Sequence, residues 1–271
     1  MSDDAALAQA LLDLAELTRR LRRDCPWDRE QTAVTIVPHT VEEAYEVADA
    51  ALAGDPAKLA DELGDLLFQV TFLAQLLEER GEGDLRSIAV AAHEKLVRRH
   101  PHVFGEAEAR TAGRVKERWE QIKTEQEGRE GVFHDVPGSL PALLGARKVQ
   151  RRAATAGYDW PDLAGPFAKL REELGELDDA VASGGVPEPE TEPTAAVAHE
   201  VGDLLFTVVN VARRLNVDPE LALRATTGRF VERVERAVHL AAEAGEDWRT
   251  LDLDAQDAWY DRAKAALHQD A

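Results

Sequence analysis

One stretch of the chain, Glu62-Leu-Gly-Asp-Leu-Leu-Phe-Gln-Val70, decides the fold. It belongs to an apolar series whose members recur close to whole turns of an α-helix: Leu59, Leu66, Leu73 and Leu77. Glu62 lies inside this series, so the predicted helix carries a carboxylate on its apolar face. Glutamate side chains are almost never fully buried unless they have a partner. The stretch therefore predicts a packed helix in which Glu62 has a partner.

Two pairs of acidic residues, each pair spaced three apart, lie on neighbouring predicted helices: Glu43 with Glu46, and Glu62 with Asp65. Residues three apart share a helix face, so an antiparallel hairpin would bring four carboxylates together. Two such charges about 5 Å apart repel by roughly 3 kcal/mol at an effective dielectric near 20, and a bound cation would relieve that repulsion. Thr40 and Glu43 also fit a capping box, which is the structural alternative for Glu43.

The same pattern occurs a second time, as Glu200-Val-Gly-Asp-Leu-Leu-Phe-Thr-Val208, where seven of nine positions are identical at an offset of 138 residues. Upstream, Glu172-Glu-Leu-Gly-Glu176 corresponds to Glu42-Glu-Ala-Tyr-Glu46. The second copy has eight more residues between its acidic pairs, and a Gly- and Pro-rich stretch at 183–193 accounts for them as a longer loop. An internal repeat of this kind predicts two similar helical units.

These residues resemble a known family. Glu-Glu-x-x-Glu followed after a spacer by Glu-x-x-Asp is the signature of the all-α nucleoside triphosphate pyrophosphohydrolases, and two copies resemble the two-repeat MazG proteins. Three further motifs strengthen the resemblance: Cys25-Pro-Trp-Asp-Arg-Glu-Gln-Thr32, Arg99-His-Pro-His-Val-Phe-Gly105 and Trp119-Glu-Gln-Ile-Lys123. The resemblance spans about Leu11 to Lys264. It implies an all-α fold and the reaction NTP + H₂O → NMP + pyrophosphate.

The resemblance also implies that the acidic pairs are metal ligands. The predicted ligands are Glu43, Glu46, Glu62 and Asp65 in the first repeat, and Glu173, Glu176, Glu200 and Asp203 in the second. Oxygen-rich sites suit hard cations, so Mg²⁺ is favoured, with Mn²⁺ as a substitute. Mg²⁺ in such a site would orient the phosphates and lower the pKa of a bound water.

Cationic residues follow each carboxylate set. Lys95 and Arg99 lie four apart on a predicted helix over 87–99, and Arg229 and Arg233 have the same spacing after Asp218-Pro219. Surface ion pairs are the alternative for these cations. The resemblance, in which a cation of this helix contacts the triphosphate, favours substrate binding. The same prediction extends to Trp160, Tyr260 and Lys264. For the equivalent Trp27, a ligand wall and a packed loop aromatic are equally good interpretations.

The second repeat is the predicted catalytic one, because that copy is the active one in the two-repeat members it resembles. Its predicted catalytic residues are Glu173, Glu176, Glu200, Asp203 and Arg229. The chain departs from those members in having Thr227 for Asn, Arg229 for Lys and Tyr260 for Trp. The first repeat keeps Lys95 and Trp119. Arginine can replace lysine as a phosphate contact, although its planar fork is not an equivalent point charge.

Local signals predict the remaining boundaries. A helix is expected over 5–23 and a loop from Cys25 to Pro38, and Asp55-Pro56 starts the next helix as N-cap and first helical residue. Gly64 and Gly202 are interpreted as points where another helix passes close. The expected domains are 1–128 and 139–271, with a linker over 129–138; the second begins with a helix from about Ser139 to Thr155.

Composition excludes several classes of protein. A formal net charge of −20 argues against a nucleic-acid surface, which needs a basic stripe. Cys25 is the only cysteine, so no intramolecular disulfide can form and a reducing compartment is the natural interpretation. The acidic start, Met1-Ser-Asp-Asp4, is unlike a signal peptide, and no run is expected to approach the length of a membrane span. We expect a cytoplasmic protein without a membrane partner.

The sequence thus predicts an all-α protein of two tandem repeats. One helical hairpin cannot bury its leucine stripe alone, so repeats or subunits must pair into four-helix bundles, and the resemblance makes that a homodimer. The predicted activity is Mg²⁺-dependent NTP hydrolysis in nucleotide-pool house-cleaning. The alternatives are a non-catalytic helical adaptor that binds metal or nucleotide, and a pyrophosphohydrolase for phosphoribosyl-ATP or dUTP.

Overall fold

The structure is a computed structural model that describes residues 3–104, 131–134, 136–185 and 192–269. Within these ranges the chain forms helices and no strand, as predicted, and it divides into two compact units, Met1–Gly128 and Arg129–Ala271. The helices of the first unit are α1 (Asp3–Asp24), α2 (Pro26–Glu30), α3 (Ala33–Ala53), α4 (Pro56–Arg80), α5 (Leu85–Arg99) and α6 (Pro101–Phe104). Those of the second are α8 (Ala142–Thr155), α9 (Ala164–Gly184), α10 (Ala195–Arg214), α11 (Pro219–Glu243), the 3₁₀ turn η1 (Trp248–Thr250) and α12 (Leu253–Gln269).

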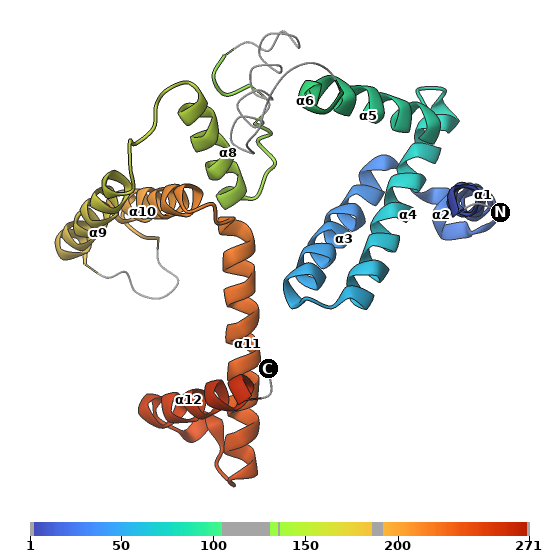
Figure 1. The fold of residues 1–271 in the computed structure, drawn as a ribbon. Helices are drawn as coiled ribbons and strands as arrows, with labels where there is room; N and C mark the ends of the chain where they lie inside the picture. Colours follow the sequence, from blue (N-terminus) through green and yellow to red (C-terminus); the bar gives the residue numbers. More distant parts are fainter. Residues whose placement is uncertain (1–2, 105–130, 135, 186–191, 270–271) are drawn as a thin grey trace. The chain divides into compact units, whose positions relative to one another are not determined.

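The first unit is built on an antiparallel hairpin of α3 and α4 (Figure 1). Gly54 closes α3 in the left-handed conformation, with φ of 71°, which glycine adopts without steric cost. Asp55 then caps α4 by accepting hydrogen bonds from the backbone N–H groups of Ala57 and Lys58, as the Asp-Pro signal predicts. Ile36 of α3 packs with Phe72 and Leu76 of α4 in a small core.

The start of α3 corrects the sequence analysis. The predicted loop from Cys25 to Pro38 is wrong, because α2 occupies part of it and α3 begins at Ala33. Thr32 caps α3 in a reciprocal pair with Thr35, and Pro38 lies inside the helix. The capping box at Thr40 is therefore also wrong, since the Thr40 hydroxyl lies inside the helix and donates to the Ile36 carbonyl at 3.3 Å. Glu43 has no capping role, which leaves its carboxylate for other partners.

The second unit repeats the hairpin with α9 and α10, and α8 packs against α10 (Figure 1). α11 packs along α12 and also contacts α8. Asp218 caps α11 through the N–H groups of Glu220 and Leu221, as predicted, and its carboxylate also forms an ion pair with Arg147 of α8. This one side chain therefore both starts α11 and ties it to α8.

The glycine interpretation is wrong for the described part of the chain. A Cβ added to Gly64 or Gly202 would meet no atom within 4 Å, so no described helix passes close to either residue. The expected passage from Trp119 to Lys123 lies outside the described residues, as do residues 129, 130 and 135 of the expected linker.

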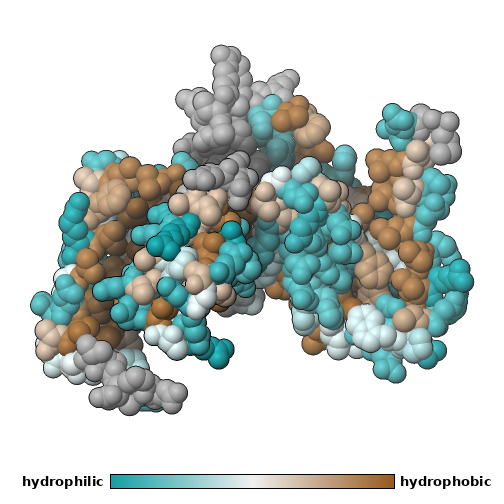
Figure 2. All heavy atoms as spheres, turned by 90° about the horizontal axis from the view of Figure 1, so that it is seen from below, coloured by the Kyte–Doolittle hydropathy of each residue, from teal (hydrophilic) through white to brown (hydrophobic). Residues whose placement is uncertain are grey.

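Both hairpins carry hydrophobic side chains on their surfaces (Figure 2). The exposed positions correspond at the repeat offset: Leu63, Leu67 and Val70 on α4, and Val201, Leu205 and Val208 on α10. Leu205, for example, is 51% exposed. An apolar stripe of this kind normally faces another layer of protein.

The expectation that no run approaches a membrane span is wrong for α10. Among the described helices α10, with 20 residues, is long and apolar enough to cross a membrane by length and composition alone, although no such run was expected. The same helix carries Glu200 and Asp203, and carboxylates are costly at the centre of a bilayer. The pattern is that of an amphipathic helix with one apolar and one acidic face.

Candidate metal centre

The four acidic residues predicted in the second repeat converge where α9 runs beside α10. Carboxylate oxygens of Glu173, Glu176 and Glu200 all lie within 4.8 Å of one another. Glu200 also belongs to a second group, in which its oxygen lies within 4.8 Å of Asp203 and of a ring nitrogen of His199. Glu200 therefore joins the two acidic pairs into one site.

Glu173 is the buried member of this site, with 3% of its surface exposed. Lys169, one helical turn earlier, contacts its Oε1 at 2.7 Å. Its Oε2 is buried and has no hydrogen-bond partner among the described residues. A buried anionic oxygen without a partner is costly, and an oxygen-only donor set of this kind fits a hard divalent cation.

The electrostatics of the second site reflect crowded negative charge. Burial and the neighbouring carboxylates of Glu173 and Glu200 raise the pKa of Glu176, against the opposing effect of Lys169. His199 lies 2.9 Å from Asp203, and the pKa of its imidazole is raised by a backbone hydrogen bond and by Asp203 and Glu200. Both shifts indicate a site that attracts positive charge.

The first repeat forms an equivalent cluster between α3 and α4. Oxygens of Glu43, Glu62 and Asp65 lie within 4.8 Å of one another, and Glu62 is 8% exposed, as its place in the apolar series predicts. Burial raises the pKa of Glu62, and a hydrogen bond with the Glu46 carboxyl raises it further. Burial and the charge of Asp65 raise the pKa of Glu43. All four predicted ligands of this repeat thus lie together.

The predicted substrate-binding residues are placed differently. In the described part of the chain no hydrogen bond or ion pair joins Lys95, Arg229, Arg233 or Lys264 to either cluster. Lys95 and Arg99 lie on α5, which continues from the far end of α4. Arg229 donates to the Thr226 hydroxyl on its own helix, and the Tyr260 ring packs against Phe230, with 6.1 Å between the ring centroids.

Two residues beside the second cluster were missed by the sequence analysis, Lys169 and His199. Both could have been found from spacing, since Lys169 precedes Glu173 by four residues and His199 precedes Asp203 by four. The position of Lys169 corresponds to His39 in the first repeat, which lies 3.7 Å from Glu42. The second repeat therefore has a permanent cation where the first has an imidazole.

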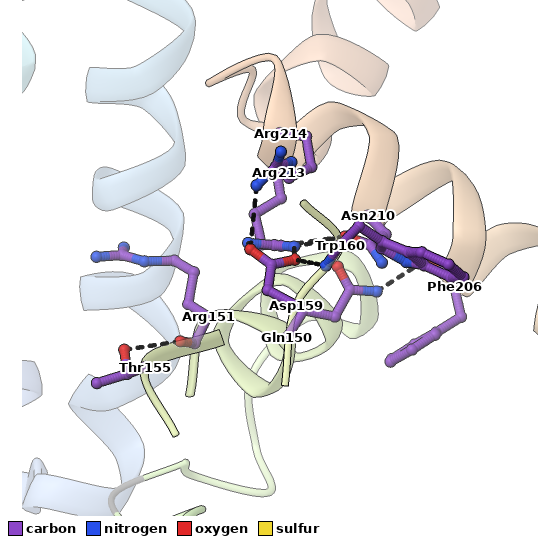
Figure 3. Close-up of polar contacts among 9 residues, drawn as sticks. All are labelled: Gln150, Arg151, Thr155, Asp159, Trp160, Phe206, Asn210, Arg213 and Arg214. Atoms are coloured by element: carbon purple, nitrogen blue, oxygen red, sulfur yellow. Dashed lines mark hydrogen bonds and ion pairs between the residues drawn. The ribbon is translucent and has the colours of Figure 1, made fainter. Parts of the chain in front are cut away.

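Trp160 lies in the turn between α8 and α9. The preceding Asp159 accepts hydrogen bonds from Arg213 and Arg214 of α10, which fasten the turn to that helix (Figure 3). The indole of Trp160 lies directly against Gly165, where an added Cβ would come within 2.2 Å of the ring. Trp160 and Phe206 line one cavity, which Gln150 and Asn210 also line.

Comparison with known sequences connects this geometry to a family. The sequence profile described as "MazG nucleotide pyrophosphohydrolase domain" matches residues 31–104 and 166–248, which are the two repeats. The two matched segments include both carboxylate clusters.

Curated relatives match nearly the whole chain. It is 40% identical to the "Nucleoside triphosphate pyrophosphohydrolase" of Escherichia coli K12, over 94% of this chain and 95% of the relative. It is 36% identical to the "Nucleoside triphosphate pyrophosphohydrolase/pyrophosphatase MazG" of Thermotoga maritima, over 93% and 94% respectively. A Mycobacterium tuberculosis protein named "Nucleoside triphosphate pyrophosphohydrolase" is 33% identical over 57% of this chain and 48% of the relative.

Proposed function

Because the chain belongs to the MazG nucleotide pyrophosphohydrolase family, we propose that it hydrolyses nucleoside triphosphates to the monophosphate and pyrophosphate at the α9–α10 hairpin. The observation that carries this assignment is Glu173, whose buried carboxylate has one oxygen on Lys169 and the other without a partner. Oxygens of two more carboxylates, Glu176 and Glu200, lie within 4.8 Å of it, and Asp203 lies within 4.8 Å of Glu200.

Each residue of the site has a role in this proposal. Glu173, Glu176, Glu200 and Asp203 would hold Mg²⁺, or Mn²⁺ in its place. When bound, Mg²⁺ supplies charge neutralisation for the phosphates and lowers the pKa of a bound water. Lys169 would turn from Glu173 to a phosphate oxygen, since a flexible ammonium group can serve either anion.

Arg229 is the remaining proposed contact. It lies on exposed surface of α11 and is held only by Thr226 of the same helix, so it can reach a triphosphate without breaking an ion pair among the described residues. Arg233, Tyr260 and Lys264 are assigned the same substrate-facing role, and so are Lys95 and Arg99 in the first repeat, by the resemblance that predicted them.

We also propose that the protein is a homodimer. The matching exposed positions on α4 and α10 support this, because each hairpin presents the same apolar stripe. Two copies of a hairpin would bury these stripes as a four-helix bundle. A cytoplasmic protein in nucleotide-pool house-cleaning agrees with the single cysteine and with a negative charge that disfavours nucleic acid.

A pyrophosphate-release assay tests the activity. The protein is incubated with each of the eight common NTPs and dNTPs, with Mg²⁺ and with EDTA. We expect monophosphate and pyrophosphate in equal amounts, and only with the metal. Release of orthophosphate, or binding of nucleotide without turnover, would contradict the proposal.

A further inference from the structure

The donor groups of the two repeats differ in one ligand type. In the described part of the chain, three groups of side chains place possible ligand atoms within 4.8 Å of one another. Two of these groups consist of carboxylates alone, whereas the third combines Glu200 and Asp203 with the imidazole of His199. Oxygen ligands suit Mg²⁺, while imidazole suits later transition metals such as Zn²⁺ and Ni²⁺. The three groups therefore offer different chemistry to a cation.

The geometry of this third group fits a shared ion. His199 and Asp203 are four residues apart, so their side chains lie on the same face of α10. The distance from His199 Nδ1 to Asp203 Oδ2 is 2.9 Å. Neighbouring ligands of an octahedral ion are about 3 Å apart when each lies about 2.1 Å from it. The two side chains already have that separation, and the His199 side chain is 69% exposed, so an ion can reach it.

A histidine and a carboxylate at this spacing can also form an ordinary surface pair, and α11 has one. His239 lies 3.1 Å from Glu243, and neither belongs to a donor group among the described residues. The His199 pair differs because Glu200 connects it to Glu173. Glu173 is 3% exposed, and its buried Oε2 has no partner in the described structure. A buried anionic oxygen of this kind indicates that the connected cluster receives a cation.

The first repeat lacks the imidazole at the matching position. At the repeat offset of 138 residues, His199 corresponds to Asp61, just as Glu200 corresponds to Glu62. The described donor group of the first repeat consists of carboxylates alone. The two hairpins thus repeat the carboxylates but not the nitrogen donor, and their metal preferences should differ for that reason.

We propose that His199, Glu200 and Asp203 form a mixed nitrogen–oxygen site for a divalent transition-metal ion of the class that imidazole prefers, such as Zn²⁺ or Co²⁺. An ion in this site uses the Glu200 carboxylate that also belongs to the Glu173 group, so it competes with Mg²⁺ for that ligand. The first repeat, with Asp61 in place of the histidine, keeps a preference for Mg²⁺. The inference rests on the proposed metal site of the second repeat, but not on the reaction catalysed there.

Competitive titration calorimetry with Co²⁺ and Mg²⁺, without nucleotide, tests this in the full-length chain. The background variant is Glu62→Gln/Asp65→Asn, so that the heat reports the second repeat. The readout is the Kd for Mg²⁺ divided by the Kd for Co²⁺. We expect His199→Asp, which gives the second repeat the residue of the first, to lower this ratio at least about tenfold. That is the lower end of the loss seen when even an outer-shell partner of a metal is removed.

X-ray absorption at the cobalt edge provides a readout that a structural role of His199 would not change. A bound imidazole adds scattering from its ring carbons to the spectrum, which carboxylates and water do not. We expect this contribution in the Co²⁺-loaded background protein and its loss in His199→Asp. The exposure of the side chain means that the substitution should leave the fold intact, which circular dichroism checks.

His239→Asp is the matched control. It makes the same substitution in the other exposed pair of histidine and carboxylate four residues apart. Because that pair has no third donor among the described residues, the substitution should leave both the ratio and the imidazole scattering unchanged.

The outcomes separate this inference from the proposed function. A ratio that His199→Asp does not lower, or that His239→Asp lowers equally, would overturn the mixed site, and so would a cobalt spectrum without imidazole scattering. Either result could accompany normal pyrophosphate release with Mg²⁺, which would leave the proposed activity standing. A lowered ratio with loss of imidazole scattering, in a protein that releases no pyrophosphate, would support the mixed site and refute the activity.

Discussion

Glu173 illustrates at the scale of one residue how the site works. Its carboxylate is buried beside Lys169, yet one oxygen has no partner in the described structure. Folding alone would favour an apolar side chain there, because burying a charge costs free energy unless the charge is fully paired. The arrangement is therefore better explained by a ligand that arrives after folding.

Glu200 gives the first residue-scale test, because it belongs to both carboxylate groups of the second repeat. We expect Glu200→Gln to abolish Mg²⁺ binding in that repeat, and Glu62→Gln to do so in the first, without unfolding either unit. Titration calorimetry would follow the stoichiometry and circular dichroism the fold. Glu243→Gln, an exposed change on α11 next to His239, is the control. A folded Glu200→Gln protein that keeps full Mg²⁺ stoichiometry would count against the site.

The pKa shifts predict a pH dependence. Burial first, and then neighbouring carboxylates, raise the pKa of Glu43, Glu62 and Glu176 above the ordinary value of 4.5. A carboxyl with a higher pKa in the folded state contributes stability below 4.5 and loses that contribution as pH rises through its raised pKa. Bound Mg²⁺ stabilises the ionised form of these carboxylates. The Mg²⁺-induced gain in Tm should therefore be small near pH 4.5 and grow as the pH rises above it.

The pH experiment compares Tm with Mg²⁺ and with EDTA at each pH, so that titrations unrelated to the clusters cancel in the difference. A gain in Tm that is the same at every pH would mean that the raised carboxyls are not the metal ligands.

Single residues also show what the sequence could and could not predict. The partial burial of Glu62 followed from its place among leucines at helical spacing, and the repeat transferred the pattern to the second cluster. Thr40 was wrongly predicted as a cap, because Thr32 offers the same chemistry eight residues earlier and the helix continues through Pro38. The buried amide oxygen of Gln150, which has no partner among the described residues, carried no signal, because such an atom depends on tertiary contacts that its neighbours in sequence do not reveal.

At the scale of helices, two matched caps allow a comparison between the repeats. Asp55 and Asp218 each cap a helix that starts with proline, but only Asp218 also pairs with Arg147 of another helix. Asp55→Ala should cost about 1 kcal/mol, the usual value of a cap. Asp218→Ala should cost about 1 kcal/mol more, since a partly buried hydrogen-bonded ion pair is lost as well.

Chemical denaturation of both variants beside the wild type checks this difference. Arg147→Ala is the control for the ion pair, and it should account for the excess cost of Asp218→Ala. Equal costs for the two aspartate variants would show that α8 and α11 gain no stability from the contact.

Helix-level prediction succeeded where local chemistry decides the outcome. The Asp-Pro helix starts and the helical spacing of the apolar residues depend on neighbours in the sequence. Both features are present in the structure. The glycines at 64 and 202 were interpreted through an assumed partner helix, and no described helix lies there. Among the described residues no hydrogen bond or ion pair joins Lys95, Arg229 or Arg233 to the carboxylates, and the orientation of α5 and α11 depends on packing that no local pattern encodes.

The whole molecule should respond to metal as a ligand that binds only the folded state. At a Mg²⁺ concentration about 100 times its Kd, linkage adds about 2.7 kcal/mol to the stability of a site. For units of this size that corresponds to several degrees in Tm, since each kcal/mol moves Tm by about 4 °C. Scanning calorimetry in low-salt buffer with Mg²⁺ or EDTA measures it. A Tm that does not change with Mg²⁺ would contradict the assignment of the converging carboxylates as metal ligands.

The division of labour between the repeats is the central claim. Both hairpins gather carboxylates, and each has a lysine beside its buried glutamate. Lys169 contacts Glu173 at 2.7 Å, whereas Lys58 lies 4.0 Å from Glu62. At the position that corresponds to Lys169, the first repeat has His39, which lies 3.7 Å from Glu42. From the family resemblance, and with the closer lysine contact at Glu173, we propose that the second repeat is catalytic and that the first has a minor or structural role.

The most direct test compares kcat/KM for pyrophosphate release in two double variants, Glu62→Gln/Asp65→Asn and Glu200→Gln/Asp203→Asn. The two pairs occupy the same positions of the repeat and remove the same charge. The account predicts that the second variant loses nearly all activity, by a factor of at least about 1000, or about 4 kcal/mol of transition-state stabilisation, while the first keeps most of it. Loss of activity in the first variant with retention in the second would contradict the account and move the active site to the other repeat.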